Sequence, residues 1–452
     1  MFAIEDKKTF VILVLSLFLA YLTWYNFSAA LGEISQHFHL TPGETGQILS
    51  AFQLGYVTLV LASGWIVDFI GERKTMAWAS LGAGISSLLL VFLARDFLSI
   101  LFIRLLVGLF CGLIYVPGMS YLSKLYPPRQ RGRILGGFTA ALTLSFAGSY
   151  FIGGPLAAAF SWEVSIIWTS VPAVLSWFLI LFWLDDAAER AHNEQPALEE
   201  DTKLHDDNRN MDLGDRNSDK NRDSNTRSGT APGKPLPAPR GGYSGPVLIT
   251  LGYMGHTWEQ HAFHGWIGPF IAASALTVGM DSAAATSLGG QLSSVIITTG
   301  VVSIYLMGWL ADRWSRTKVI ITCALATFFV QLFFGFLHGA ALSIVLIVGI
   351  WLGFWIQADS AVYKAGLADM VEIDLRAKAL GFQAAAGYAM TVISPMAFGL
   401  ILEAFNGALD NPIHANNWGL PFMVLAVGAF MTLASGFLLR RLPQSTLMGQ
   451  KK

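Results

Sequence analysis

Apolar stretches of about 20 residues, separated by short polar connections, recur along the chain. A helix needs about 20 mostly apolar residues to cross the hydrocarbon core of a bilayer. Lipid offers no partner to unpaired backbone groups, and these stretches are too long for barrel strands, so they predict membrane-spanning helices. The pattern therefore predicts an all-α integral membrane protein of two six-helix bundles, with spans near 10–30, 45–67, 75–94, 98–123, 134–158, 162–184, 246–273, 286–311, 317–338, 342–366, 379–402 and 418–440.

The composition excludes several other classes of protein. Hydrophobic residues make up 54% of the 452 residues and charged residues only 13%, whereas soluble domains average about a quarter charged. The formal net charge is −1 and no basic tract is long enough to follow a phosphate backbone, so we expect no nucleic-acid partner. The two cysteines, Cys111 and Cys323, lie far apart in apolar stretches and predict neither a disulfide framework nor a metal pair.

Lysine and arginine in the short connections alternate from one end of the spans to the other. Cytoplasmic loops of membrane proteins carry the excess of these residues. The asymmetry predicts that both termini and the central segment are cytoplasmic, in a multi-pass protein of the inner (cell) membrane that we expect to be a monomer. The residues that set this orientation are Lys7, Lys8, Arg73, Lys74, Lys124, Arg129, Arg131, Arg133, Arg313, Arg316, Lys318, Arg376, Lys378, Arg440 and Arg441.

The central segment, residues 186–245, holds more than a third of the charged residues of the chain and almost no large apolar ones. Such a segment buries too little apolar surface to offset the entropy of ordering it. We expect a disordered cytoplasmic linker between an N-terminal bundle (1–185) and a C-terminal bundle (246–441), followed by a cytoplasmic tail (442–452).

The two halves of the chain repeat each other at three landmarks, in the same order and at equivalent places in the topology. Residues 64–68 (GWIVD) match 308–312 (GWLAD), 107–112 (VGLFCG) match 348–353 (VGIWLG), and 133–136 (RILG) match 378–381 (KALG). An internal repeat of this kind predicts two bundles of parallel topology, related by a pseudo-two-fold axis. Such halves can rock about a shared central site, which is the basis of alternating access.

The first landmark also carries a family resemblance. The segment from Gly64 to Lys74 is similar to the cytoplasmic signature Gly-x-x-x-Asp-Arg-x-Gly-Arg-Arg/Lys of the major facilitator superfamily, with Phe69 and Glu72 in place of two arginines. The resemblance implies twelve helices, secondary transport and a latch at this loop. Within the spans, Arg104 resembles the fourth-span arginine that the family often uses in proton coupling. The candidate latch residues of both copies are Gly64, Asp68, Gly71, Arg73, Gly308, Asp312, Arg313 and Arg316.

Ionisable side chains inside spans are costly and are therefore candidates for function. The seventh span concentrates them: at about 100° per residue, His256, Glu259, Gln260 and His264 share a face about 140° wide, with His261 outside it. We expect Glu259 to bind a proton, with His256 as its neighbour. Further candidates for the substrate cavity or proton coupling are Arg104, Asp359, Lys364, Asn26, Gln53 and Tyr56.

Together these features predict a secondary active transporter of a small polar solute. We expect an organic or inorganic anion as substrate, alternating access and a proton as coupling ion. The alternative is a transporter of a transition-metal ion or metal complex, with Glu259, His261 and His264 as ligands. An enzyme is not expected, because the seventh-span histidines do not have zinc-protease spacing and the chain has neither a nucleophile elbow nor a Walker loop. No cofactor or resident metal is predicted.

Overall fold

The computed structural model describes residues 4–184 and 242–448, and these form helices and turns without a strand. The predicted linker lies almost entirely outside the described residues. The N-terminal half consists of α1 (Ile4–Tyr21), α2 (Asn26–Ala29), α3 (Leu31–Phe38), α4 (Pro42–Ile70), α5 (Glu72–Leu93), α6 (Phe97–Cys111), α7 (Tyr115–Leu125), α8 (Pro128–Ala159) and α9 (Trp162–Trp183).

The C-terminal half has the same order of spans, with three short 3-10 helices in addition. It consists of α11 (Ser244–Thr277), α12 (Ser282–Arg313), α13 (Arg316–Phe334), η1 (Gly335–Leu337), α14 (Leu342–Ala358), α15 (Ser360–Met370), α16 (Ile373–Asn406), η2 (Pro412–His414), α17 (Gly419–Arg441) and η3 (Pro443–Met448).

The all-α membrane fold predicted from the hydrophobic pattern is confirmed, with differences inside three spans. Ten helices, or end-to-end helix pairs, of the described chain are long and apolar enough to cross a membrane; α1 and α11 are the remaining members of the two bundles. The fourth and tenth spans are each two helices, α6–α7 and α14–α15, and the first breaks after Tyr21. The average hydrophobicity of a stretch does not report such breaks, because each break is only a few residues long within a mostly apolar stretch.

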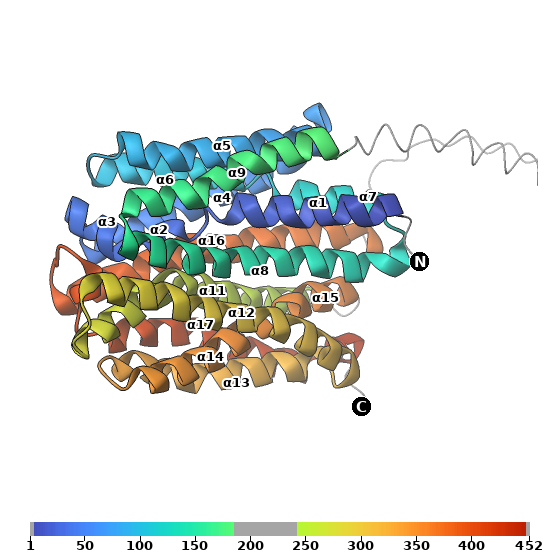
Figure 1. Cartoon of the computed structure of the whole chain (residues 1–452). Coiled ribbons are helices and arrows are strands. Elements are labelled where there is room, and N and C mark those ends of the chain that lie inside the picture. The colour runs from blue at the N-terminus through green and yellow to red at the C-terminus, as the bar shows by residue number, and fades with distance from the viewer. Residues whose placement is uncertain (1–3, 185–241, 449–452) are drawn as a thin grey trace, which may run out of the picture. The chain divides into compact units, whose positions relative to one another are not determined.

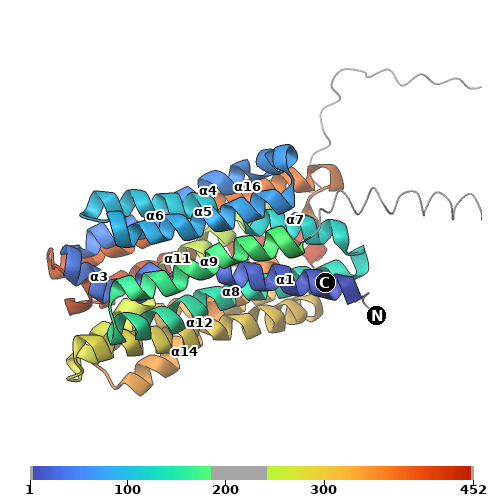
Figure 2. The same ribbon diagram turned by 45° about the horizontal axis from the view of Figure 1, so that its top comes forward.

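The long helices run between two ends of the molecule. The α3 end carries α3 and η2, at the left of Figure 1, and the terminal end carries the beginning of α1 and the end of α17. The halves meet mainly along two helix pairs, α4 with α16 and α8 with α12. In both views α8 lies beside α12, and Figure 2 shows α4 running alongside α16.

At the α3 end each of these helix pairs crosses at glycine. A Cβ atom on Gly46 of α4 would lie 2.8 Å from the Pro395 carbonyl oxygen and 3.1 Å from Gly399 of α16. A Cβ atom on Gly154 of α8 would lie 2.8 Å from the Cα of Gly290 of α12. Since real side chains do not tolerate contacts below 3 Å, only glycine permits this backbone approach, and the α3 end is closed.

Hydrogen bonds across the same seam support the closure. The Asn411 amide donates to the Gly32 carbonyl at 2.8 Å, and the Tyr150 hydroxyl donates to the His264 carbonyl at 2.6 Å. The Thr286 hydroxyl contacts the Glu33 carboxylate at 3.5 Å, and burial raises the pKa of that carboxyl group. The seam therefore combines close backbone packing with polar contacts between the halves.

At the terminal end the same four helices are apart. Each of the four helices carries a second glycine, 18 residues away from the glycine at the crossing. Eighteen residues make five helical turns, so the two glycines lie on the same face of their helix. A Cβ atom at any of these second glycines would meet no atom within 4 Å. The structure is therefore closed at the α3 end and open between the halves at the terminal end, at Gly64 on α4, Gly136 on α8, Gly308 on α12 and Gly381 on α16.

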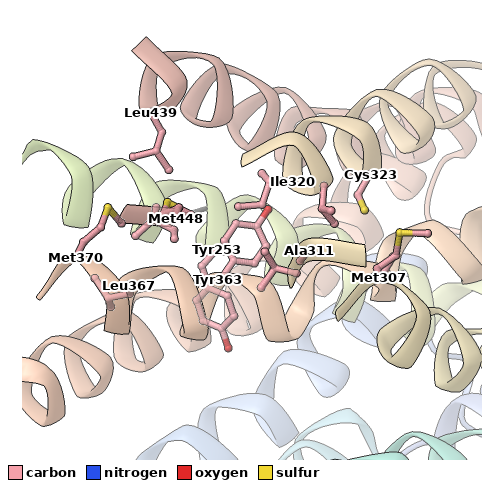
Figure 3. Close-up of a cluster of buried hydrophobic side chains, with 14 of the residues drawn as sticks. Tyr253, Met307, Ala311, Ile320, Cys323, Tyr363, Leu367, Met370, Leu439 and Met448 are labelled. Atoms are coloured by element: carbon pink, nitrogen blue, oxygen red, sulfur yellow. The ribbon is translucent and has the colours of Figure 1, made fainter. Parts of the chain in front are cut away.

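The C-terminal bundle is held together near the terminal end by a cluster of buried apolar side chains. Tyr253 of α11, Tyr363 of α15 and Cys323 of α13 belong to it, and Figure 3 shows the two tyrosines side by side. The cluster joins α11, α12, α13 and α15 into one packed unit. It thereby fixes the wall that carries the polar residues described next.

Candidate functional site

A central cavity of about 80 Å³ lies between the two halves. Both bundles contribute to it, as expected for a site at the interface of two repeats. Its lining residues are Trp24, Tyr56, Tyr115, Thr139, Leu142, Thr143, Phe146, Tyr253, Thr257, Gln260, His261, Ile304, Gln357, Ser360, Lys364 and Tyr388.

The cavity is lined by aromatic and polar side chains and by one side chain with a permanent charge. Lys364 of α15 is the one lining residue with a permanent charge, and no carboxylate lines the cavity. Gln260 and Gln357 add amides, and Tyr56 packs edge-on against Tyr388, with ring centroids 5.7 Å apart. A cavity of this kind can neutralise one negative charge and cover the rest of a small molecule with rings.

The break between α14 and α15 places Asp359 behind this lining. Its carboxylate lies 2.9 Å from Nδ1 of His256 and accepts a 2.8 Å hydrogen bond from the Tyr363 hydroxyl. Both members of the His256–Asp359 pair are buried. Asp359 is thus joined to the seventh span. Within the described residues it forms no ion pair with Lys364, the pairing that their spacing left open.

Glu259 is buried in the wall of the C-terminal bundle, one helical turn beyond His256. Its carboxylate accepts a 2.8 Å hydrogen bond from the side-chain amide of Gln331 on α13. A buried carboxyl group with a neutral partner can hold or release a proton without breaking an ion pair. The hydrogen-bond partner of Glu259 is therefore Gln331 of α13. His256, which we expected beside Glu259, pairs with Asp359 instead.

Arg104 holds the break in the first span. Its guanidinium donates to the carbonyls of Thr23 at 3.1 Å and Trp24 at 2.8 Å, and to the Asn26 side chain at 3.2 Å. It also lies 4.6 Å from the centre of the Phe52 ring. The side chain is buried and does not line the cavity, so its contact with the cavity is through Trp24.

Of the other candidate residues in the N-terminal bundle, some are buried between helices and one lines the central cavity. The Asn26 amide donates to Ser87 at 3.1 Å and to Thr169 at 3.2 Å, which ties the break to two other helices. Gln53 is buried, and its carbonyl oxygen has no partner among the described residues. Of the three candidates, Tyr56 alone reaches the cavity.

The seventh-span cluster is spread over three environments. Gln260 and His261 line the cavity, His256 and Glu259 face the C-terminal bundle, and the His264 ring lies edge-on to Tyr25 with centroids 5.9 Å apart. No group of three metal-binding side chains is found in the described chain. Glu259, His261 and His264 diverge, which removes the ligand set that the metal-transport alternative required.

The candidate latch is disengaged in this structure. Asp68 is exposed, and Arg73 donates to the Leu181 carbonyl of α9 instead. Glu72, which replaces an arginine of the family signature, forms an ion pair with Lys124 of α7 and accepts a 3.0 Å hydrogen bond from Ser120. The glutamate that departs from the family signature is therefore paired with a lysine of the same bundle.

The second copy has the same pair with the charges exchanged. Arg316 occupies the position of Glu72 in the repeat and forms an ion pair with Asp369 of α15. Arg313 lies over the Trp309 ring at 3.7 Å, and Asp312 is exposed. In the described part of each bundle, an ion pair at the terminal end thus joins the third span to the end of the fourth.

The sequence did not predict several of the lining residues. Tyr115, Tyr253 and Tyr388 line the cavity, as does His261, which the helical projection placed outside the polar face. Tyrosines at these positions resemble interfacial or packing residues in sequence. The repeat offered one signal: Tyr115 begins α7 directly after the break in the fourth span, as Ser360 begins α15 in the tenth.

Comparison with known proteins agrees with this architecture. The model of the Major Facilitator Superfamily matches residues 13–283 and 248–452. The hexuronate transporter of Bacillus subtilis is 23% identical over 422 residues, covering 90% of this chain and 91% of that protein. The probable sulfoacetate transporter SauU of Cupriavidus necator is 23% identical over 447 residues, covering 93% and 92%. A bacterial homologue of the lysosomal transporter Spinster, crystallised in an inward-facing and occupied conformation, superposes with a TM-score of 0.72 at 13% identity over 98% of both chains.

Proposed function

Because the chain belongs to the Major Facilitator Superfamily, we propose that this secondary transporter carries a small organic monoanion, driven by protons. The observation that carries the choice of substrate is Lys364, the one permanent charge in a cavity without a carboxylate. One lysine neutralises one carboxylate, and a second negative charge would be buried without a partner. The aromatic lining suits the ring or carbon chain that bears the carboxylate.

The named relatives support an anion as substrate. Hexuronates carry one carboxylate and sulfoacetate carries two acidic groups, and both relatives cover nearly the whole chain. At 23% identity they do not select one substrate for this protein. The single lysine favours the hexuronate type over the doubly charged one.

The direction of the molecule in the membrane follows from its basic residues. Those of the short connections gather at the terminal end, which we place in the cytoplasm of a cell whose inner membrane holds the protein. The structure then represents the state that is open to the cytoplasm. Alternating access requires a second state, in which the α3 end opens and the terminal end closes.

Proton coupling is assigned to the buried groups of the C-terminal bundle. Glu259 and Asp359 directly precede the lining residues Gln260 and Ser360, and Lys364 follows Ser360 by one turn of α15. A proton that enters this wall changes the charge beside the lysine that holds the substrate. The substrate, from the cavity, and the proton, from the C-terminal bundle, thus both act on the electrostatic potential at Lys364.

The test is binding and transport by the purified protein with a panel of galacturonate, sulfoacetate and xylose as the monoanion, dianion and neutral solute. We expect saturable uptake of galacturonate and an affinity at least about tenfold lower for sulfoacetate and xylose. Lys364→Gln should weaken galacturonate binding about ten- to hundredfold, since a hydrogen bond to a charged group contributes about 1.5–3 kcal/mol. Lys318→Gln, an exposed lysine at the same end, is the matched control. Equal binding by both variants would refute the proposal.

A further inference from the structure

Three side chains at or beside the central cavity carry buried polar atoms that have no hydrogen-bond partner among the described residues. They are Nε1 of Trp24, the hydroxyl of Tyr25 and both ring nitrogens of His264. All three side chains are at most 3% exposed. Leaving a buried donor unpaired costs about 1–3 kcal/mol, so three together are unexpected unless another state of the protein satisfies them.

These groups surround a single ring contributed by α8. The centroid of Phe146 lies 4.9 Å from that of Trp24, 5.1 Å from that of Tyr25 and 6.2 Å from that of His264. Trp24 and Tyr25 come from the break in the first span, whereas His264 comes from α11 of the other half. Parting of the halves at the α3 end would therefore separate His264 from the other two and expose all three.

A positive charge without a counter-ion stands behind this cluster. Arg104 is 2% exposed, donates to the carbonyl of Trp24, and forms no ion pair with a carboxylate of the described chain. A buried guanidinium that is satisfied only by carbonyls and an amide leaves the surrounding region electropositive. Tyr25 directly follows Trp24, whose carbonyl accepts the hydrogen bond from Arg104.

We propose that Trp24, Tyr25 and His264 form a second anion subsite, filled by Phe146 in the present state and opened when the α3 end opens. The inference rests on the proposed function, because it concerns the same monoanion. An indole N–H, a phenol O–H and an imidazole N–H all donate to carboxylate oxygens, and none of them adds a negative charge. The substrate enters at this subsite and is passed toward Lys364 as the halves rock.

The subsite makes the two faces of the transporter respond differently to substitution. Tyr25→Phe and His264→Leu should each raise the KM for galacturonate at the face of the α3 end by about tenfold, and leave the KM at the terminal face within twofold. Uptake is measured in right-side-out and inside-out membrane vesicles. A cysteine at Asp410, exposed at the α3 end, identifies the faces by thiol labelling. Because neither group loses a hydrogen bond in this state, thermal stability should not fall.

Tyr150→Phe is the matched control. It also removes a buried hydroxyl, but one that donates to the His264 carbonyl across the closed seam. Its loss weakens closure, so the KM at the α3 face should stay the same or decrease, the opposite of Tyr25→Phe. A KM that rises equally at both faces in Tyr25→Phe, or that rises equally in Tyr150→Phe, would overturn the subsite.

A second measurement uses the closed state directly. Phe146→Ala removes the ring that lines the cavity and packs against the three donors, and should strengthen galacturonate binding by the purified protein at least about threefold, a gain that His264→Leu cancels. Weaker binding in Phe146→Ala would count against the subsite. If the wild type binds no monoanion and Lys364→Gln changes nothing, the proposed function fails. If Lys364 matters but Tyr25 and His264 do not, the subsite alone fails.

Discussion

The side chain of Glu403, near the end of α16, accepts a 2.7 Å hydrogen bond from the backbone N–H of Gly43, in the first turn of α4. The first N–H groups of a helix have no partner in the helix and form the positive end of its dipole, so a carboxylate is favoured there. Glu403 follows Gly399 by one turn, and Gly399 lies at the crossing with Gly46. The bond therefore fastens the two halves at the point where their backbones are closest.

Glu403→Gln should loosen the α3 end. A hydrogen bond to a charged group contributes about 1.5–3 kcal/mol, and the variant should shift the population toward the state open at the α3 end by about tenfold. The measurement is thiol labelling of Thr286→Cys, a buried position in the seam, against a background of two buried native cysteines. Glu44→Gln is the control, because Glu44 caps its own helix through the Thr41 N–H. Equal labelling rates in the two variants would contradict the assignment.

The paired glycines predict how the opposite state closes. Gly64 lies on the same face of α4 as Gly46, and Gly381 on the same face of α16 as Gly399. In the other state we expect α4 and α16 to cross at Gly64 and Gly381, as they cross at Gly46 and Gly399 in this structure. Gly64→Val should therefore hold the terminal end open and stop transport, while galacturonate binding from that side persists. Gly46→Val should have the opposite effect and increase labelling of Thr286→Cys. If Gly64→Val and Gly46→Val changed the labelling of Thr286→Cys in the same direction, this symmetry would be refuted.

The geometry of Glu403 also predicts a role for Asp68. Asp68 follows Gly64 by four residues, as Glu403 follows Gly399, and it is exposed in this state. When the terminal end closes, its carboxylate should meet the first turn of α16, as Glu403 meets that of α4. Asp68→Asn removes a contact of the other state only, so it should slow transport and increase labelling of Ser360→Cys in the cavity without lowering the melting temperature. Unchanged labelling at both ends would count against it.

The sequence predicted the parts of this fold that depend on local periodicity. Hydrophobic stretches identify the spans, and the repeat identifies which helices correspond, because both signals lie within one stretch of chain. Contacts between distant residues are not encoded in that way. His256 meets Asp359 and Glu259 meets Gln331 because the fold brings α11 within side-chain reach of α13 and of the break at Asp359, and one sequence does not reveal this arrangement. The helical projection grouped the polar residues of α11 but did not tell which face met the cavity.

The ion pairs at the terminal end should tolerate exchange of their charges. Glu72 is nearly buried whereas Lys124 is largely exposed, so the pair itself contributes about 1 kcal/mol. Glu72→Arg places two positive charges side by side and should lower the melting temperature of the purified protein. Adding Lys124→Glu should restore most of the loss, since the repeat already uses this polarity in Arg316 and Asp369. Failure of the double variant to recover would show that the hydrogen bond from Ser120, not the charge pair, fixes Glu72.

Glu259→Gln should separate proton coupling from substrate binding. A glutamine has the shape of a protonated glutamate and keeps an acceptor oxygen for the Gln331 amide, so the wall of the bundle remains packed. The variant cannot release a proton, and galacturonate accumulation driven by a pH gradient in proteoliposomes should be lost, while exchange of labelled for unlabelled substrate stays within about twofold of the wild type. Gln331→Leu is the companion variant: it leaves the carboxyl group able to titrate without its partner, so coupling should persist with an altered pH dependence. Full accumulation by Glu259→Gln would place the proton on the His256–Asp359 pair instead.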